Sequence, residues 1–270
     1  MMKILYVSQY FPPEMGAPSA RVYELSKNWV RMGHRVQVLT GFPNHPTGKI
    51  PAEYKRLFRK GTTVERVDGI DVIRTWLYPA PNRLPKERIL NYTSFFVSAS
   101  LRGLFLHKPD VVIGTSPQLL SDLTGWWLGK VMRRPFIFEI RDIWPESLVA
   151  SGVGHNNSPM IKALKGLSVF LYEQANKIVV VTEAFKEELM GKYRVPEHKI
   201  SIVENGIETD EFMPLGNVQE IRKRFGLDHR FVVSYIGTIG YAHGLEVIIK
   251  SARIISDKIP QICFVLLGGC

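Results

Sequence analysis

Cysteine and long apolar runs are the scarcest features of this 270-residue sequence. Only Cys263 and Cys270 occur, and no histidine pattern with zinc-ligand spacing accompanies them, so we expect neither a disulfide framework nor a zinc site. The apolar runs, such as 263–267, are far shorter than the roughly 18 residues that cross a bilayer. The run at 4–7 is also too short for a secretory signal. We therefore expect a cytoplasmic chain without a transmembrane helix.

Familiar cofactor and hydrolase motifs are missing as well. The loop at 11–21 holds a single glycine, Gly16, and no acidic residue closes the next apolar run at 39–42, so an NAD-binding Rossmann enzyme is disfavoured. The sequence has no P-loop, no G-x-S-x-G, no H-E-x-x-H and no C-x-x-C. Covalent serine or cysteine catalysis and metal-dependent hydrolysis therefore lose their usual sequence support.

Positive charge, in contrast, is abundant and unevenly distributed. The formal net charge is +10, and residues 1–206 hold 28 of the 35 Lys and Arg but only 18 of the 25 Asp and Glu. The remaining 64 residues are balanced, with seven of each sign. Such an excess favours an anionic partner, namely nucleic acid, anionic lipid or a phosphorylated small molecule, although solubility alone would also explain it.

Apolar runs alternate with helical patterns along the chain. Strands are predicted at 3–10, 34–42, 70–78, 110–116, 136–142, 177–182 and 199–205. Helices are predicted at 20–32, 86–106, 119–133, 159–175 and 183–193. Near-continuous Val and Ile runs between helices are typical of a parallel sheet covered on two faces, so we expect an α/β doubly wound domain.

The pattern is interrupted once and then resumes. We expect a first domain over 1–206, a hinge at 207–216 rich in Gly, Pro and acidic residues, and part of a second α/β domain over 217–270. Its predicted elements are a strand at 231–240, a helix at 245–258 and a strand at 261–269. These are too few to bury their own apolar faces, so we expect a fragment of a longer protein.

Two loops that follow predicted strands carry candidate binding residues, because ligands of open α/β sheets bind beyond the carboxyl ends of strands. The first, 11–21, contains Glu14 and opens at Gly16 onto a helix with Ser19 as a possible cap, which suits an anionic or sugar ligand. An ordinary strand-to-helix turn is the alternative. His45, in the loop after the second strand, is a possible base or ligand, although such a histidine is usually solvated or structural.

The second loop, 138–147, crowds charged residues around a strand end. Asp142 leaves the strand where it can accept hydrogen bonds from a hydroxylated ligand, and Trp144 offers an apolar face on which sugars pack. A structural pair of Arg141 with Asp142 is the alternative.

Taken together, several blocks of the sequence resemble one enzyme family. The blocks are YFPPEMGAPSARVYEL, DVVIGTSPQ, FEIRDIWPES, KIVVVTEAF, HKISIVENGIETDEF and VVSYIGTIGYAHGLEVII. They are similar, in this order and over essentially the whole chain, to the retaining GT-B glycosyltransferases of family 4, and most of all to the WbuB-like colanic-acid and O-antigen subgroup. The resemblance implies two Rossmann-like domains, a nucleotide-sugar donor, UDP-linked, on the second domain and a lipid-linked or oligosaccharide acceptor on the first.

The resemblance also implies a chemistry without metal, cofactor or protein nucleophile, in which the leaving diphosphate takes the acceptor proton. Asp142 and Arg141 become the candidate catalytic residues. The candidate substrate-binding residues are Glu14, Gly16, Ser116, Pro117, Trp144, Gly237, Thr238, Gly240 and His243.

Three features depart from the family pattern. Thr115 and Ser116 stand where many members have a histidine, and Thr238 and His243 stand where many have an arginine and a lysine. The family's E-x7-E segment would lie beyond Cys270.

The activity expected is transfer of a hexose or N-acetylhexosamine in synthesis of bacterial surface polysaccharide such as lipopolysaccharide, with this chain inactive alone. Other readings are a different GT-B enzyme, such as a sugar-nucleotide epimerase, or a non-catalytic basic module that binds anionic membrane or nucleic acid. Aromatic and basic residues interleave only at 95–108, which suits a membrane face or a partly buried helix. Arg83, Lys86, Arg88, Arg102 and Lys108 bracket this apolar helix. We therefore expect peripheral attachment to the anionic inner face of the cytoplasmic membrane, and no nucleic-acid partner.

Overall fold

A computed structural model describes the 270-residue chain except for residues 82, 83, 151, 153, 154, 156, 211, 214, 215, 238, 241, 242, 269 and 270. The chain divides into two compact units. The first comprises Met1–Ser147 with Asn156–Asn205, and the second comprises Leu148–His155 with Gly206–Cys270. Within the described residues, no helix is long and apolar enough to cross a membrane.

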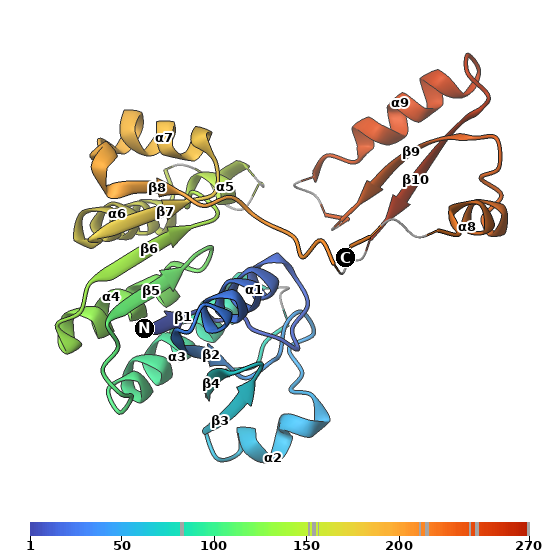
Figure 1. Ribbon diagram of the computed structural model, residues 1–270. Coiled ribbons are helices and arrows are strands. Elements are labelled where there is room, and N and C mark those ends of the chain that lie inside the picture. Colours follow the sequence, from blue (N-terminus) through green and yellow to red (C-terminus); the bar gives the residue numbers. More distant parts are fainter. Residues whose placement is uncertain are drawn as a thin grey trace. The chain divides into compact units, whose positions relative to one another are not determined.

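The first unit is built on an eight-stranded sheet, as far as the described residues go (Figure 1). Its strands are β1 Lys3–Val7, β2 Arg35–Gly41, β3 Thr62–Val67, β4 Ile70–Thr75, β5 Val111–Thr115, β6 Phe136–Ile140, β7 Lys177–Val180 and β8 Ile200–Ile202. Their order across the sheet is β3-β4-β2-β1-β5-β6-β7-β8. Neighbouring strands run parallel except β3, which is antiparallel to β4.

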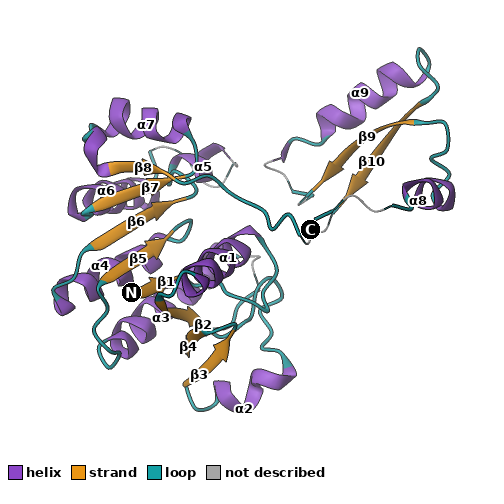
Figure 2. Cartoon of the chain, viewed as in Figure 1, coloured by secondary structure: helices purple, strands orange, loops and turns teal. Residues whose placement is uncertain are grey.

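Helices cover the two faces of this sheet (Figure 2). They are α1 Ala17–Arg31, α3 Pro85–Gly103, α4 Leu119–Met132, α6 Pro159–Gln174 and α7 Glu183–Tyr193. The short α2 Lys55–Phe58 precedes β3, α5 Glu146–Ala150 begins in the first unit and ends in the Leu148–His155 segment of the second, and short 3₁₀ turns lie at Ala52–Tyr54 and Glu197–Lys199. Successive residues of β1 point to opposite faces: Tyr6 packs with Val22 of α1, whereas Leu5 packs with Phe95 of α3. The predicted doubly wound α/β fold is confirmed.

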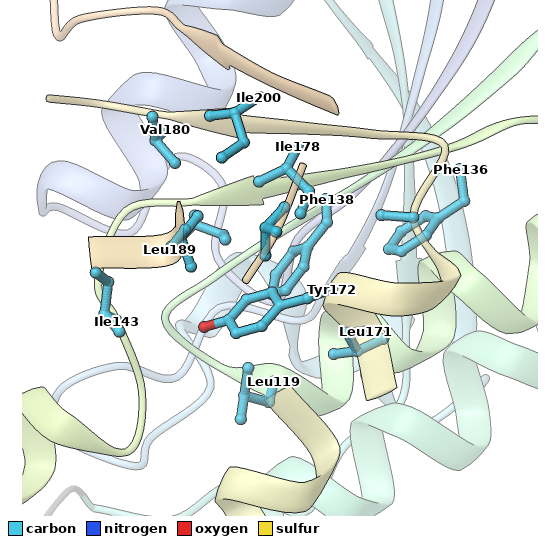
Figure 3. Close-up of a cluster of buried hydrophobic side chains, with 13 residues drawn as sticks. Leu119, Phe136, Phe138, Ile143, Leu171, Tyr172, Ile178, Val180, Leu189 and Ile200 are labelled. Carbon is cyan, nitrogen blue, oxygen red and sulfur yellow. The ribbon is translucent and has the colours of Figure 1, made fainter. Parts of the chain in front are cut away.

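A third apolar cluster holds the β6–β8 half of the sheet together (Figure 3). Phe138 of β6 stacks on Tyr172 of α6 with ring centroids 5.7 Å apart, and Leu189 of α7 packs into the same cluster. Leu119, at the start of α4, also contributes. The beginning of α4 is thereby held against the core, close to the carboxyl end of β5.

Two glycines let α4 lie directly against β5. A Cβ atom at Gly125 would lie 3.1 Å from Cα of Gly114 and 3.0 Å from a ring carbon of Phe136. Both distances are shorter than ordinary side-chain contacts, so a larger residue would push the helix off the strand. This close approach fixes where the loop between β5 and α4 lies.

The structure differs from the sequence prediction at the strand ends and at one edge. The predicted strand 3–10 ends at Val7, and the predicted strand 136–142 ends at Ile140, so the residues that follow belong to loops. Strand β3 was not predicted, because it is an edge strand without a continuous apolar run. The short α2 and α5 were also not predicted.

The second unit consists of α8 Val218–Arg224, β9 Phe231–Ile236, α9 Glu246–Ser256 and β10 Ile262–Leu267. Strands β9 and β10 are parallel, with Phe231 opposite Ile262. No residue of α8 or α9 is buried, and the side chains of Ile236 and Val247 are 74% and 67% exposed. The apolar faces of these elements are therefore largely uncovered in this chain.

We expect this exposure to appear as weak protection against hydrogen exchange. Amides beyond about residue 215 should exchange much faster than those of the strands in the first unit, because open apolar faces leave little to stabilise the backbone hydrogen bonds. Exchange followed by mass spectrometry on the 270-residue chain measures this directly. Equally strong protection of β9 and β1 would contradict it.

Candidate functional site

The carboxyl edge of the first sheet contains a topological switch point. Strands β1 and β5 are neighbours in the sheet, but the chain leaves β1 toward β2 and β4 and leaves β5 toward β6, β7 and β8. The loops after β1 and β5 therefore diverge and leave a crevice between them, which is where open α/β sheets bind ligands.

A pocket of about 190 Å³ lies in this crevice, and we call it the switch-point pocket. It is too small to enclose a whole drug-sized ligand. The loops after β1, β2, β5 and β6 and the first half of α3 line it. The lining residues are Tyr10, Glu14, Met15, Gly16, Pro18, Ser19, His45, Arg88, Tyr92, Pro117, Gln118 and Trp144. The structure thus brings together four of the predicted site residues: Glu14, Gly16, Pro117 and Trp144.

Glu14 joins two of these loops through one of its carboxylate oxygens. Its Oε1 accepts hydrogen bonds from the backbone N–H groups of Asn44 at 2.8 Å and His45 at 2.9 Å. Its Oε2 is buried and has no hydrogen-bond partner in the described part of the chain. Burial raises the pKa of the carboxyl to about 7, although the two backbone bonds and the charge of Arg74 oppose the rise. Glu14 is therefore poised between its two protonation states near neutral pH.

Two further polar atoms of the pocket lining are buried without a partner among the described residues. These are Oγ of Ser19 and Nε2 of Gln118, whose Oε1 caps α4 by accepting from the backbone of Ser121. Ser19 was expected to cap α1, but Gly16 is the residue at the cap position, and no side chain bonds there. Gly16 has φ of 144°, a conformation that L side chains rarely adopt, so the turn into α1 requires glycine.

Arg88 supplies the positive charge of the pocket. It forms no ion pair or side-chain hydrogen bond in the described part of the chain, and its charge, together with burial as the larger cause, lowers the pKa of His45. Burial and hydrogen bonding to Tyr92 raise the pKa of Tyr10 well above its usual value. His45 and Tyr10 are therefore neutral near pH 7. Neither of these two rings carries a negative charge that would balance the cation of Arg88.

Amide side chains beneath the pocket connect its loops to α3. Asn91 accepts a hydrogen bond from Nε2 of Gln9 and donates to Oδ1 of Asn44 at 3.2 Å and to the carbonyl of Tyr78 at 2.7 Å. These bonds tie the loops after β1, β2 and β4 to one helix. The pocket is thereby preorganised.

The loop after β6 is held by Ser116, which directly follows β5 and is fully buried. Its Oγ accepts from the backbone N–H of Arg141 at 2.8 Å, and its carbonyl accepts from Nε of Arg141 at 2.6 Å. Ser116 thus positions the loop and does not line the switch-point pocket. No hydrogen bond or ion pair joins Arg141 to Asp142 in the described residues, and the two side chains interact through the charge of Arg141 alone.

Asp142 is exposed and lies at the edge of this loop, outside the pocket lining. Partial desolvation raises the pKa of its carboxyl, and the charge of Arg141 opposes the rise. Its carboxylate is free to accept hydrogen bonds from a bound ligand.

A buried charge network lies below the site. Arg21 of α1 donates from Nε to Oε1 of Glu139 at 3.0 Å, and the other oxygen of Glu139 accepts from the hydroxyl of Tyr6. The Nη atoms of Arg21 also donate to the carbonyls of residues 203 and 204 and to Oδ1 of Asn205, at 2.9 to 3.1 Å. Arg21 therefore fixes the last residues of the first unit to its first helix.

The remaining predicted residues belong to the second unit. Gly237 follows β9 and donates its N–H to the carbonyl of Leu267, Gly240 accepts from the N–H of His243, and His243 packs edge-on against Tyr235. Thr238 lies outside the described residues. Within the described part of the chain, no group of three or more His, Cys, Asp or Glu side chains is arranged to hold a metal ion.

Sequence comparison assigns the first unit. The model of the family described as Glycosyltransferase Family 4 matches residues 19–211, which is more than half of the chain. This chain belongs to glycosyltransferase family 4.

Curated relatives carry glycosyltransferase names. An uncharacterized glycosyltransferase of Methanocaldococcus jannaschii is 25% identical over 265 residues, covering 95% of this chain and 60% of that protein. The putative colanic acid biosynthesis glycosyl transferase WcaI of Escherichia coli is 23% identical, covering 99% of this chain and 66% of the relative. The capsular polysaccharide biosynthesis glycosyltransferase CapM of Staphylococcus aureus is 24% identical, covering 69% and 48%. The chain thus spans at most about two thirds of these relatives.

Solved structures support the same fold. Anabaena HepE, in a complex with UDP and glucose, matches with a TM-score of 0.65 and 15% identity over 100% of this chain and 62% of that chain. A second HepE structure, with UDP-glucose, matches with a TM-score of 0.63, 15% identity and coverage of 100% and 61%. The predicted GT-B fold class is confirmed.

Sequence reasoning missed Arg88, Tyr92, Ser19 as a pocket residue and Gln118. Arg88 and Tyr92 lie on α3, which follows β4, and nothing in the local sequence says that this helix returns to the loops after β1 and β2. Gln118 directly follows a Ser-Pro pair at the end of a predicted strand. Its position in that loop could therefore have identified it as a candidate site residue.

Proposed function

We propose that the protein transfers a hexose or N-acetylhexosamine from a nucleotide sugar to a lipid-linked or oligosaccharide acceptor during synthesis of bacterial surface polysaccharide such as lipopolysaccharide. The observation that carries this is the switch-point pocket, lined by both apolar and polar side chains and bounded by loops that Asn91 ties together, at the carboxyl edge of a family 4 domain. Supporting it, two relatives are named for colanic acid and capsular polysaccharide biosynthesis, and the HepE structures contain UDP and UDP-glucose.

We further propose transfer with retention and without metal, in the manner of the WbuB-like subgroup. The bond between the sugar C1 and the UDP diphosphate breaks as the acceptor oxygen bonds to C1 on the same face, and the acceptor proton passes to the diphosphate. The protein then contributes positioning and charge. Asp142 would orient the acceptor hydroxyl with Arg141 beside it, and Gly237, Thr238, Gly240 and His243 would face the donor.

A transfer assay tests this proposal. A version of the chain extended at its C-terminus to the length of its curated relatives, supplied with UDP-glucose or UDP-N-acetylglucosamine and a prenyl-diphosphate-linked sugar, should form a glycosylated lipid and release UDP. The 270-residue chain alone should not, because its second unit leaves its apolar faces open. Absence of transfer from every UDP-sugar by the extended chain would refute the function.

We expect Asp142→Asn to reduce transfer by about 100-fold or more in the extended chain, a loss typical of a positioned polar group. The substitution keeps the size of the side chain but removes its charge. Turnover and thermal melting are measured on the same variant, with Glu53→Gln, at an exposed glutamate, as the control. Unchanged turnover, or a loss explained by unfolding, would remove Asp142 from the catalytic residues.

Peripheral attachment to the inner face of the cytoplasmic membrane is the second part of the proposal. Helix α3 exposes Ile89, Leu90, Val97 and Leu101, and Phe105 just beyond it is 80% exposed. Lys86, Arg102 and Lys108 flank these side chains. Arg83, also expected there, lies outside the described residues, and Arg88 lines the pocket instead. Apolar side chains flanked by cations favour anionic lipid.

Sedimentation with liposomes should therefore depend on lipid charge and on salt. Binding to vesicles with anionic lipid should weaken as salt rises, since the Debye length falls from about 10 Å at 0.1 M to about 3 Å at 1 M. Replacing Leu101 and Phe105 by serine should weaken binding further, whereas the same change at Met190 of α7 should not. Binding indifferent to salt and lipid charge would count against this attachment.

A further inference from the structure

A second pocket lies at the opposite edge of the first sheet, and we call it the amino-edge pocket. Its volume is about 410 Å³, which is within the range of small-molecule sites. Residues near the starts of β1, β2 and β4 and the segment that enters β5 line it, namely Lys3, Ile4, Arg35, Gln37, Asp71, His107, Lys108 and Pro109. Strand β1, with five residues at about 3.3 Å each, runs from this pocket toward the switch-point pocket, so the two sites are separate.

The strand residues of this pocket lie on one face of the sheet. Leu5 of β1 belongs to the apolar cluster that packs against α3, and Lys3, two residues earlier, shares that face. Arg35 is the direct partner of Lys3 on β2. Gln37 follows Arg35 by two residues and pairs with Asp71 of β4. The four polar side chains are therefore neighbours on the same face.

The segment before β5 brings a third cation to the same edge. The backbone N–H of Lys3 donates to Oδ2 of Asp110, and the N–H of Asp110 donates to the carbonyl of Lys3, each at 2.7 Å. These bonds hold Lys108, two residues before Asp110, near the start of β1. Arg35, Lys3 and Lys108 thus lie at the entrances of three adjacent strands, β2, β1 and β5, which together span roughly 10 Å.

The charges of these three cations are not balanced within the pocket. In the described part of the chain, the side chains of Lys3, Arg35 and Lys108 form no ion pair and no hydrogen bond. Asp71 is the one carboxylate among the lining residues, and it lies 3.9 Å from Arg66, outside the lining. Three cations against one carboxylate leave an excess of two positive charges, which favours a dianion.

Interaction with helix dipoles does not explain the cations. The C-terminal ends of the helices gather at the amino edge of a parallel sheet and favour positive charge there. The last turns of α1, α3 and α4 already contain Arg31, Arg102 and Lys130 for this role. Lys3 and Arg35 lie in strands and directly opposite each other, a placement that destabilises a sheet when the two charges are alike. An anion bound between them removes the repulsion.

We propose that the amino-edge pocket binds an organic phosphate, whose dianionic phosphate group is held by Lys3, Arg35 and Lys108. A phosphate monoester concentrates close to two negative charges and three free oxygens on one centre, so each cation can bond to a different oxygen. The cavity also has room for the organic part, whose hydroxyl groups can bond to Gln37 and Asp71. This site is additional to the site of transfer, and the proposal does not depend on the proposed function.

A soluble metabolite and an anionic lipid are two sources of such a phosphate. Leu104 and Phe105 lie three and two residues before the lining residue His107, and their side chains are 41% and 80% exposed. The acyl chains of a lipid could contact these side chains while its phosphate occupies the pocket. The experiment therefore includes a probe for each source.

Titration calorimetry of the 270-residue chain at about pH 8 tests the proposal without any turnover. At this pH a phosphate monoester carries nearly two charges, because its second pKa is about 6. The probes are glycerol 3-phosphate, glycerol, succinate, and phosphatidylcholine vesicles with and without phosphatidate. We expect glycerol 3-phosphate, which has the head group of phosphatidate, to bind at least tenfold more tightly than succinate, whose two charges lie on separate groups. Glycerol should not bind.

Variants assign the contacts. A chain with Lys3→Gln and Arg35→Gln loses two cations but keeps its backbone hydrogen bonds, and its affinity for glycerol 3-phosphate should fall by about tenfold or more, the usual effect of losing a hydrogen bond to a charged group. Lys162→Gln with Lys165→Gln, at exposed positions of α6, is the control with the same change in charge and should bind normally. Lys108→Gln is the second test if thermal melting shows that the double variant is unfolded.

Three results would overturn the proposal: no binding of glycerol 3-phosphate, equal binding of succinate, or full binding by the folded pocket variants. Loss of binding in Arg88→Gln instead would place the phosphate in the switch-point pocket and would also contradict it.

The vesicle arm distinguishes the two sources of the phosphate. Binding to phosphatidate vesicles that the Lys3 and Arg35 double variant loses, and that glycerol 3-phosphate displaces, would identify the lipid. Vesicle binding that the double variant keeps, together with loss of glycerol 3-phosphate binding, would identify a soluble phosphate. The transfer assay on the extended chain is independent of these titrations, so failure of this proposal and failure of the proposed function are observed separately.

Discussion

Arg21→Met is expected to lower the free energy of unfolding of the first unit by about 3–5 kcal/mol, the usual cost of removing one partner from a buried ion pair. The side chains of Arg21 and Glu139 are 7% and 4% exposed, so solvent would not compensate the carboxylate that is left behind. The substitution also removes the donors to residues 203–205.

Tryptophan fluorescence during urea unfolding measures this, because all five tryptophans lie in residues 1–147 and therefore report on the first unit alone. Arg31→Met, at an exposed position on the same helix, is the control and should cost well under 1 kcal/mol. Adding Glu139→Gln should recover part of the loss, because it removes the uncompensated charge. Equal effects at residues 21 and 31 would show that the network does not stabilise the unit.

Glu14→Gln should make the first unit more stable than the wild type above about pH 7, but not at acidic pH. Burial raises the pKa of Glu14 from 4.5 to about 7 in the folded state, so between these values the folded chain binds a proton that the unfolded chain lacks. Stability therefore falls as pH rises through this window. At 1.36 kcal/mol per pKa unit, the loss is about 3 kcal/mol and is complete above the folded pKa.

The measurement is the difference in unfolding free energy between Glu14→Gln and wild type, followed by tryptophan fluorescence from about pH 4.5 to above pH 7. The difference should grow toward alkaline pH by about 3 kcal/mol. Other titrating groups are common to the two chains and largely cancel. Glu53→Gln should give a difference that is flat with pH, and a flat difference for Glu14→Gln would mean that its carboxyl titrates normally.

The parallel strands were predictable because their signal is local. Strand β5, VVIGT, is buried on two faces, so its residues are uniformly apolar or small. Such a run between two helical segments is typical of a strand in a parallel sheet. Strand β3, TTVERV, lies at an edge with one face toward water, so its alternating residues give only a weak signal.

The site was predictable to the extent that it follows strand ends. Glu14 and Trp144 were found because they come shortly after apolar runs, and the carboxyl ends of parallel strands share one edge. Arg88 was assigned only to a membrane face, since its place in the pocket depends on how α3 crosses the sheet edge, which Asn91 fixes through bonds to Gln9 and Asn44. Contacts between segments so distant in sequence produce no periodic pattern of residue types from which they could be predicted.

The bonds of Arg21 also determine when the first unit can finish folding during synthesis on the ribosome. Its partner Asn205 is 184 residues further along the chain, whereas the helix that carries Arg21 is among the first segments made. At a translation rate of about 5–20 residues per second, roughly 10 to 40 seconds separate the two. Glu139, 118 residues along, can pair with the guanidinium earlier, but the Nη groups lack their partners at residues 203–205 until the end of this interval, so the nascent first unit reaches its final structure only when its last residues have emerged.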